Sequence, residues 1–364
     1  MTRYTAAVAR PWDFSDFGKE PVFLPLEEGW WRGPRENDPA ILESLAEVGL
    51  ASGPPRADGS SSWRPSRIGE PLAVAIDHPT RAFEIARKYN AALEGFFAPP
   101  PLPSFMAILN LTEDSFSDGG ALLPAGALEE AATLRKAEGA SWLDLGAEST
   151  RPGAAPVEDS IQSERLLPAI ERLLPFQIPL SVDTRSAKVA AACLDAGATM
   201  INDVSGLTHD PAMAGLIAEK GCPVVLMHMR GTPSTMVDHA DYSDLFGEVA
   251  DELATRARAA LDAGIHPDRI LLDPGIGFAK DSRSSCALVE GAGAFRALGF
   301  DILLGPSRKS FLDPSGLLDP SDRDASTLEA ALTCARQGVA VLRLHNGRKW
   351  DSIRKAARAG EVLA

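Results

Sequence analysis

The chain has 364 residues, of which 45% are hydrophobic and 24% are charged, and its formal net charge is −14 at pH 7. This composition is typical of a folded globular protein and excludes fibrous and disordered classes. The acidic balance argues against a nucleic acid or an anionic membrane as partner, because both require a broad positive field. No apolar run in the sequence reaches the roughly 18 residues that a membrane-spanning helix needs.

The N-terminal segment and the cysteines bear on cellular location. A short apolar patch at the N-terminus is interrupted by Arg10, Pro11 and Asp13, so it is not interpreted as a signal peptide, and a cytoplasmic location is expected. The cysteines are scattered, without Cys-x-x-Cys pairs, and are interpreted as small buried apolar residues in a reducing compartment. They are Cys193, Cys222, Cys286 and Cys334.

Residues 1–98 lack the alternation of strand and helix patterns that follows them. They contain a stretch interpreted as a low-complexity connector, 53–62, and a predicted helix over 79–97 with an apolar face that includes Phe97. We interpret this region as an annex that packs on the rest of the protein, with a second active domain as the alternative. The Pro-rich residues 99–104 are predicted to form a stiff extended linker.

From residue 105 onward, eight apolar runs of strand length alternate with helix-like segments. The short Val, Ile and Leu runs suit parallel strands that are covered on both faces. A doubly wound sheet shows the same alternation, so spacing alone does not decide the fold. The predicted strands are 105–110, 142–147, 179–183, 199–203, 223–228, 269–273, 301–305 and 339–345. Amphipathic segments include 127–138, 187–196, 211–220, 242–264 and 326–338.

Polar residues at the C-terminal ends of these strands favour a barrel. In a closed parallel barrel all eight ends meet on one face, which is where barrel enzymes carry their active sites. We therefore predict an α/β fold, a (β/α)8 TIM barrel over 105–364. The polar ends are Asn110, Glu148 to Arg151, Asp183 to Arg185, Asn202 with Asp203, His228, Asp273, Ser307 to Ser310, and Arg343 with His345.

Three of these residues point to a nitrogen-rich ligand. Asp183, Asn202 and Asp273 offer carboxylate and amide groups that can pair with a flat heterocycle carrying adjacent donors and acceptors. Because buried carboxylates are costly without partners, a ligand or a neighbouring cation such as Lys309 is expected beside them.

A second group of residues points to an anion held locally on an acidic protein. Positive charge from several side chains at the same strand ends suits a phosphate or a pyrophosphate. Asn110 and the acidic residues of its loop could hold a divalent cation, because Mg²⁺ prefers hard oxygen ligands. The basic side chains are Arg151, Arg308, Lys309, Arg343 and His345.

These residues carry a family resemblance over about residues 105–358. The chain resembles the dihydropteroate synthases, pterin-binding barrel enzymes of folate synthesis, and the motifs occur together in the family's order. The matching segments are Ile108 to Gly120, Gly146 to Gly153, Ser181 to Thr184, Ile201 to Asp203, Leu226 to Met229, Leu272 to Phe278, Ser307 to Ser310 and Arg343 to His345. The first hundred residues lie outside the resemblance and are similar to extensions that some bacterial members carry.

The resemblance implies an activity and a set of roles. The activity is the joining of hydroxymethyl-dihydropterin pyrophosphate to p-aminobenzoate, with Mg²⁺ as cofactor, in a homodimer that sulfonamides target. It assigns the pterin to Asp183, Asn202, Asp273 and Lys309, and the metal to Asn110. It assigns pyrophosphate to Asn110, Thr150, Arg343 and His345, and p-aminobenzoate to Phe116, Pro152, Phe278, Lys309 and Ser310. The catalytic residues it implies are Asp118, which would stabilise a pterin-methyl cation, together with Lys309, Arg343 and His345.

Three positions depart from the family's usual pattern. Glu113 stands where Pro is usual, Ala147 where Gly is usual, and Asn346 where Asp is usual. None of them removes a residue with an assigned role, so activity is expected to remain. Two alternatives stay open: a non-catalytic paralogue that binds pterin or a partner, and a methyltransferase that passes a methyl group from methyltetrahydrofolate to a corrinoid protein.

Overall fold

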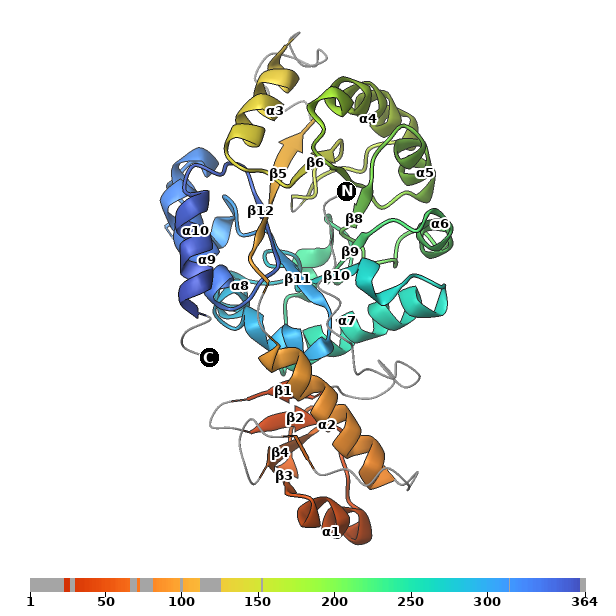
Figure 1. Ribbon diagram of the computed structural model, residues 1–364, viewed down its shortest axis with the longest axis vertical. Coiled ribbons are helices and arrows are strands. Elements are labelled where there is room, and N and C mark those ends of the chain that lie inside the picture. The colour runs from red at the N-terminus through yellow and green to blue at the C-terminus, as the bar shows by residue number, and fades with distance from the viewer. Residues whose placement is uncertain are drawn as a thin grey trace.

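A computed structural model of the protein describes residues 23–26, 30–65, 71–72, 81–98, 101–111, 126–151, 153–313 and 315–360. These residues form a closed eight-stranded barrel and a smaller N-terminal annex at one side of it (Figure 1). In this part of the chain, no helix is both long and apolar enough to span a bilayer.

All eight strands of the barrel are parallel, in the closed order β10-β11-β12-β5-β6-β7-β8-β9. The predicted TIM barrel and its eight strands are confirmed, with most boundaries within one residue. The strands are β5 (Ser104–Asn110), β6 (Trp142–Gly146), β7 (Leu180–Asp183), β8 (Met200–Asp203), β9 (Val224–Met227), β10 (Ile270–Asp273), β11 (Asp301–Leu304) and β12 (Val341–Leu344).

The strand register sets the level of the polar residues. Asn110 pairs with Gly146, Gly146 with Asp183, and Asp183 with Asn202. These residues therefore form one layer at the C-terminal ends of the strands. Apolar side chains fill the barrel interior and include Met106, Met200, Val225, Leu271 and Leu303.

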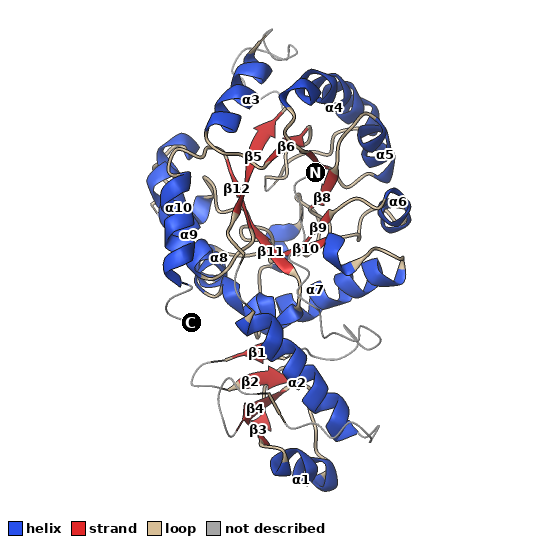
Figure 2. Ribbon diagram, viewed as in Figure 1, coloured by secondary structure: helices blue, strands red, loops and turns tan. Residues whose placement is uncertain are grey.

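Helices surround the barrel on its outside (Figure 2). They are α3 (Ala127–Ala137), α4 (Asp159–Leu173), α5 (Ala187–Asp195), α6 (Met213–Lys220), α7 (Leu245–Asp262), α8 (Ser282–Glu290), α9 (Asp324–Arg336) and α10 (Trp350–Gly360). A 3₁₀ helix, η6 (Ala292–Leu298), precedes β11. Three cysteines are buried as predicted, but Cys286 is exposed, because its place on α8 faces outward.

The annex contains an antiparallel sheet that was not predicted from the sequence. Its strands are β1 (Leu24–Pro25), β2 (Trp31–Gly33), β3 (Leu50–Pro55) and β4 (Ser61–Pro65), in the order β1-β2-β4-β3, with α1 (Pro39–Glu47) before β3. The interpretation of 53–62 as a connector was wrong, because this stretch forms the β3–β4 hairpin. Its prolines are tolerated because β3 is an edge strand, and the register shifts between Ser52 and Pro55.

Helix α2 (Arg81–Phe97) matches the predicted helix over its described residues. Its face toward the annex sheet buries Tyr89, whose ring makes edge contacts with Phe23 at 5.7 Å and Trp31 at 5.3 Å between centroids. Phe97 was predicted on the buried face, but it is 50% exposed, as the last residue of the helix. The buried contacts confirm that this helix packs an apolar face.

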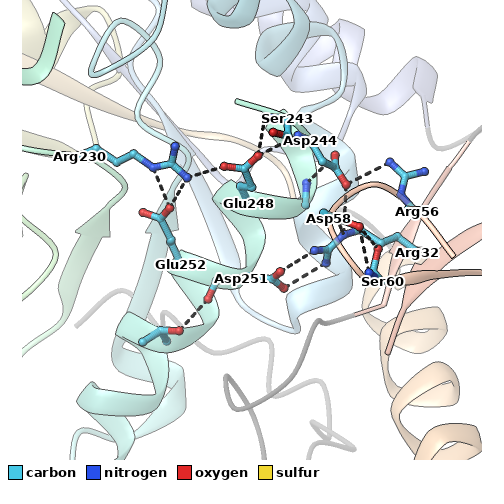
Figure 3. A network of polar contacts seen from close by, with 12 residues as sticks. Arg32, Arg56, Asp58, Ser60, Arg230, Ser243, Asp244, Glu248, Asp251 and Glu252 are labelled. Atoms are coloured by element: carbon cyan, nitrogen blue, oxygen red, sulfur yellow. Dashed lines mark hydrogen bonds and ion pairs between the residues drawn. The ribbon is translucent and has the colours of Figure 1, made fainter. Parts of the chain in front are cut away.

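Arg32 of β2 joins the annex to helix α7 of the barrel (Figure 3). The side chain is 3% exposed, and its two terminal nitrogens donate to Asp251 at 3.1 and 2.6 Å. Its Nε lies 3.1 Å from Asp58 and 3.2 Å from Asp244, the N-cap of α7. Gly247 permits this approach, because a Cβ there would lie 2.3 Å from Arg32 Nε. The annex thus holds the first two turns of α7.

Candidate functional site

A cluster of charges occupies the end of the barrel where the strands terminate. Arg343 of β12 reaches two carboxylates: its Nε lies 2.6 Å from Asp144 Oδ2, and a terminal nitrogen lies 3.0 Å from Asp183 Oδ2. Asn202 donates to Asp144 Oδ2 at 3.2 Å. The structure therefore brings the predicted Asp183, Asn202 and Arg343 together.

Asp144 is the centre of this cluster, and it was not among the site residues predicted from the sequence. The residue lies within β6 and is fully buried, and its Oδ1 has no hydrogen-bond partner among the described residues. The available signal was a lone carboxylate inside the apolar run 142–146. Such a residue requires a buried cation, which Arg343 supplies.

Burial disfavours ionisation of the Asp183 carboxyl. Desolvation raises its pKa to about 7, with Arg343 opposing the rise and the carboxylates of Asp144, Glu148 and Asp203 adding to it. Removal from water disfavours the charged form, and like charges have the same effect. A ligand that donates a hydrogen bond to Asp183 would favour the ionised form.

Asp273 and Lys309 form the other side of the site. Asp273 Oδ1 accepts from the backbone N–H of Gly275 at 2.7 Å, while burial raises the pKa of this carboxyl and Lys309 opposes the rise. Lys309 Nζ donates to the carbonyl of Ile276 and lies 4.6 Å from the centroid of the Phe278 ring. Burial lowers the pKa of Lys309 to about 8. Lys309 therefore lies close both to Asp273, which is assigned to the pterin, and to Phe278, which is assigned to p-aminobenzoate.

The loop that carries Lys309 begins at a strained residue. Arg308 has φ +60°, which is uncommon for a residue with a side chain. Its backbone N–H donates to Thr327 at 3.0 Å, and its Nε lies 2.9 Å from Asp324 Oδ1, so α9 holds the turn. The positive charge expected from Arg308 is therefore paired with Asp324.

His345 is neutral in this environment, which differs from the positive charge expected of it. Burial, together with the charges of Arg308 and Arg343, lowers its pKa to about 3. The imidazole Nδ1 lies 2.9 Å from Ser307 Oγ, which also accepts from the His345 backbone N–H at 3.2 Å. The imidazole is therefore anchored to Ser307 through Nδ1. With its proton on Nε2, a neutral His345 offers a hydrogen bond to an anion, but not a charge.

The remaining predicted residues lie in loops, and some of them lie outside the described residues. Thr150 is half-buried in the loop between β6 and α4, and Ser310 is exposed at the start of a 3₁₀ helix. Phe116, Asp118 and Pro152 lie outside the described residues, as does Glu113.

Two of the three positions that differ from the family's usual residue have a structural explanation. Ala147 is buried and is not among the residues with positive φ, so an alanine is unstrained there. Asn346 donates to Asp324 Oδ2 at 3.0 Å, beside Arg308. An aspartate at 346 would instead place a second carboxylate against Asp324.

Asn110 suits a single-ligand magnesium site. Its Oδ1 lies 3.7 Å from the position that a Cβ on Gly146 would occupy, and Asp183 Oδ2 lies 3.9 Å from the same position. The absence of a side chain on Gly146 leaves space between these oxygen donors. Among the described residues, no three His, Cys, Asp or Glu side chains are grouped to hold a metal. Mg²⁺ commonly takes one or two protein oxygens together with substrate phosphates, so the donors fit the ion.

A separate polar cavity of about 230 Å³ lies beside the charge cluster. It is lined from the β6–α4 and β9–α7 loops, and its walls include the buried ion pair of Arg185 and Glu148, at 2.9 Å. None of the predicted binding residues lines it.

The chain is similar to known proteins over its barrel. Residues 106–345 match the family model described as "Pterin binding enzyme". The dihydropteroate synthase of Synechocystis sp. is 40% identical over 281 residues, which cover 72% of this chain and 96% of that protein. The family model begins after the annex, which therefore lies outside the match.

Solved structures of dihydropteroate synthases are also similar to this chain. The Yersinia pestis dihydropteroate synthase in a sulfonamide drug complex aligns with a TM-score of 0.67 at 34% identity, covering 71% of this chain and 94% of that one. The Thermus thermophilus enzyme in complex with 4-aminobenzoate aligns with a TM-score of 0.62 at 40% identity, covering 72% and 95%. With the barrel, the charge cluster and these matches together, the chain belongs to the dihydropteroate synthases of the pterin-binding enzyme family.

Proposed function

We propose that this protein joins 6-hydroxymethyl-7,8-dihydropterin pyrophosphate to p-aminobenzoate, forming 7,8-dihydropteroate and releasing pyrophosphate. The observation that carries the proposal is the charge cluster, in which Arg343 lies against Asp144 and Asp183 at the end of a barrel of this family.

The pterin is assigned to the layer of Asp183, Asn202 and Asp273. Carboxylate and amide groups can pair with the amino and ring N–H donors of a pterin. Lys309, beside Asp273, would complete this pocket with a donor. The pairing would leave each buried polar group with a partner, which supports the assignment.

The reaction breaks the C–O bond to pyrophosphate and forms a C–N bond to the aniline nitrogen, which then loses a proton. An aniline nitrogen is a weak nucleophile, so the leaving group must be stabilised first. Arg343 supplies charge, and His345 and Thr150 would supply hydrogen bonds to the departing pyrophosphate. Mg²⁺ held at Asn110 would neutralise the same oxygens. Asp118 would stabilise the pterin-methyl cation.

The second substrate is assigned to the neighbourhood of Phe278. Its ring lies under Lys309 Nζ, so an aromatic acid placed there would have an apolar face and a cation within reach. Phe116, Pro152 and Ser310 would complete this pocket. We also propose that the protein is a homodimer, that it acts in the cytoplasm and that sulfonamides compete with p-aminobenzoate.

The direct test is an assay of pyrophosphate release with the purified full chain. Release should require both substrates and Mg²⁺, and the organic product should be dihydropteroate by mass. Methyl transfer to a corrinoid protein without pyrophosphate release would establish the methyltransferase alternative. Pterin binding without turnover would establish the non-catalytic one. Sedimentation at micromolar concentration tests the dimer, and a monomer there would contradict it.

A further inference from the structure

A glutamate in the loop between β6 and α4 has no assigned role, although both of its carboxylate oxygens accept hydrogen bonds. The side chain of Glu148 is 7% exposed. A terminal nitrogen of Arg185 donates to both oxygens at 2.9 Å. Oε1 also accepts from the backbone N–H of Val157 at 3.1 Å. Glu148 therefore joins the two ends of its own loop and ties them to Arg185, which lies two residues beyond Asp183 of β7.

The backbone carbonyl of Val157 is held as well. Gln162 of α4 is 4% exposed, and its Nε2 donates to this carbonyl at 2.9 Å. Its Oε1 accepts from Thr184 Oγ1 at 3.1 Å. Thr184 and Arg185 are adjacent residues that directly follow β7. Both backbone polar groups of Val157 are therefore fixed to the same strand end, one through Glu148 and the other through Gln162. We call these four side chains and Val157 the Val157 clamp.

The rest of the β6–α4 loop has little apolar packing to hold it. Its described residues are half-buried or exposed. The polar cavity of about 230 Å³ borders the loop at Ser149 and Pro156. Near the middle of the loop, the backbone N–H of Gly153 donates to the carbonyl of Pro233 at 3.0 Å. Because a loop beside a cavity lacks packed neighbours on that side, its position depends on polar contacts.

The position of this loop matters for the reaction because of Thr150. This residue lies two positions beyond Glu148 and is assigned to the pyrophosphate. Fixing a backbone in one conformation costs conformational entropy. When a loop is already held in its binding conformation, the ligand does not have to supply that cost. A loop that is fixed at its base therefore presents the Thr150 hydroxyl at a lower cost.

We propose that Glu148 is a positioning residue: through the Val157 clamp it fixes the β6–α4 loop, so that Thr150 is placed to bind the departing pyrophosphate. The inference rests on the proposed function, which assigns Thr150 to this group. Asp183 and Asn202, assigned to the pterin, lie on strands β7 and β8 rather than on this loop. Loosening the clamp should therefore affect pyrophosphate release much more than pterin affinity.

The test compares variants of the full chain by single-turnover pyrophosphate release, calorimetry with 6-hydroxymethylpterin and urea unfolding. Glu148→Met removes every contact of the carboxylate. It should slow release by about tenfold or more, while pterin affinity stays within about twofold. Glu148→Gln loses the charge but keeps an oxygen that can accept from Val157 and Arg185. It should lose stability, yet its release should stay within about threefold of the original rate.

Gln162→Met covers the case in which Glu148→Met does not fold. It removes the other half of the clamp without leaving a buried charge unpaired. Release should slow by about fivefold, again with pterin affinity within about twofold. Arg32→Met is the matched control, because Arg32 also forms a buried ion pair, with Asp251 at 2.6 Å in the contact between annex and α7. It should lose stability and leave release unchanged.

Hydrogen exchange at the Val157 amide gives a readout that does not depend on activity. In the original protein this amide donates to Glu148. Exchange, followed by mass spectrometry of peptides that contain Val157, should be about tenfold faster in Glu148→Met, because the acceptor is lost. It should be unchanged in Arg32→Met.

Unchanged release in Glu148→Met would overturn the proposal, even if exchange at Val157 is faster. A loss of release that follows the loss of stability across all variants, Arg32→Met included, would also overturn it, since a purely structural role produces that pattern. If the unaltered protein releases no pyrophosphate, the proposed function fails instead. Exchange at Val157 in Glu148→Met then still shows whether Glu148 holds the loop, so the two failures are distinguishable.

Discussion

Arg343 Nε lies 2.6 Å from Oδ2 of Asp144, a carboxylate with no exposed surface that comes from a strand 199 residues earlier in the chain. The pair fixes the guanidinium across the end of the barrel. Asp144→Asn keeps the size of the side chain but removes its charge. Losing one partner of a buried ion pair should lower the free energy of unfolding by about 3 to 5 kcal/mol.

The same substitution should lower turnover by about tenfold, since Arg343 is then held by Asp183 alone. Urea unfolding and the pyrophosphate assay measure the two effects. Glu171→Gln, on the outer helix α4, serves as a control for the loss of one carboxylate. A variant as stable and active as the original protein would show that Asp144 does not hold Arg343.

Arg343 itself is predicted to act mainly on the departing pyrophosphate. Arg343→Met should reduce turnover about a thousandfold, which is the scale for losing a charge that stabilises a leaving group. Pterin affinity should fall by no more than about tenfold, because Asp183 keeps its carboxylate and loses only the neighbouring guanidinium. Calorimetry with pterin and single-turnover kinetics separate the two quantities. Equal losses in both would remove Arg343 from the leaving-group role.

The elevated pKa of Asp183 makes the free protein less stable at higher pH. Its pKa rises from 3.8 to about 7 through burial. A carboxyl whose pKa is raised on folding contributes stability that is complete below the unfolded pKa and is lost as pH rises through the folded value. Relative to Asp183→Asn, the unaltered protein should therefore lose stability between pH 5 and 8. Urea unfolding at both values provides the measurement, and parallel pH profiles for the two proteins would refute this.

The annex is predicted to stabilise the barrel through Arg32. The side chain is 3% exposed and faces Asp58, Asp244 and Asp251. Arg32→Met removes a buried cation that these carboxylates share, although Asp244 keeps Arg56 at 3.1 Å. It should therefore cost about 2 to 4 kcal/mol, less than a fully buried pair because Asp251 is partly exposed.

The control for this prediction lies on the same helix. Arg258 pairs with Asp262 at 2.6 Å near the end of α7, at a more exposed position. Arg258→Gln should therefore cost less than about 1 kcal/mol. Chemical denaturation of the two variants compares them directly. Equal small losses would mean that the annex contributes little to holding α7.

Asn346 is predicted to be adapted to its neighbour Asp324. Asn346→Asp, which restores the residue usual in the family, would replace the donated hydrogen bond with a second carboxylate. We expect a loss of about 1 kcal/mol at pH 7, because a hydrogen bond is lost and like charges meet. The loss should shrink at low pH. Asn346→Ala adds no charge and should show no such pH dependence. Thermal unfolding at pH 8 and at about pH 3, below the ordinary pKa of an aspartate, distinguishes the two variants.

The local pattern of the sequence was sufficient for the barrel and for much of the site. Short apolar runs that end in polar residues predict parallel strands whose ends meet, because side-chain periodicity and strand length are local properties. Asp183, Asn202 and Asp273 could be named on this basis, since each stands at or near the end of such a run. The order of the motifs along the chain then indicated the family.

Only the tertiary structure decided which charges meet. Arg343 pairs with Asp183 across 160 residues of sequence, while Arg185 pairs with Glu148 across 37 residues, and no spacing rule connects either pair. The β3–β4 hairpin was missed because Gly, Pro and Ser residues favour turns locally, whereas pairing of β4 with β2 overrides that preference. Ion pairing and strand pairing depend on which surfaces the closed barrel and the annex bring together, and this is a property of the whole fold rather than of any segment.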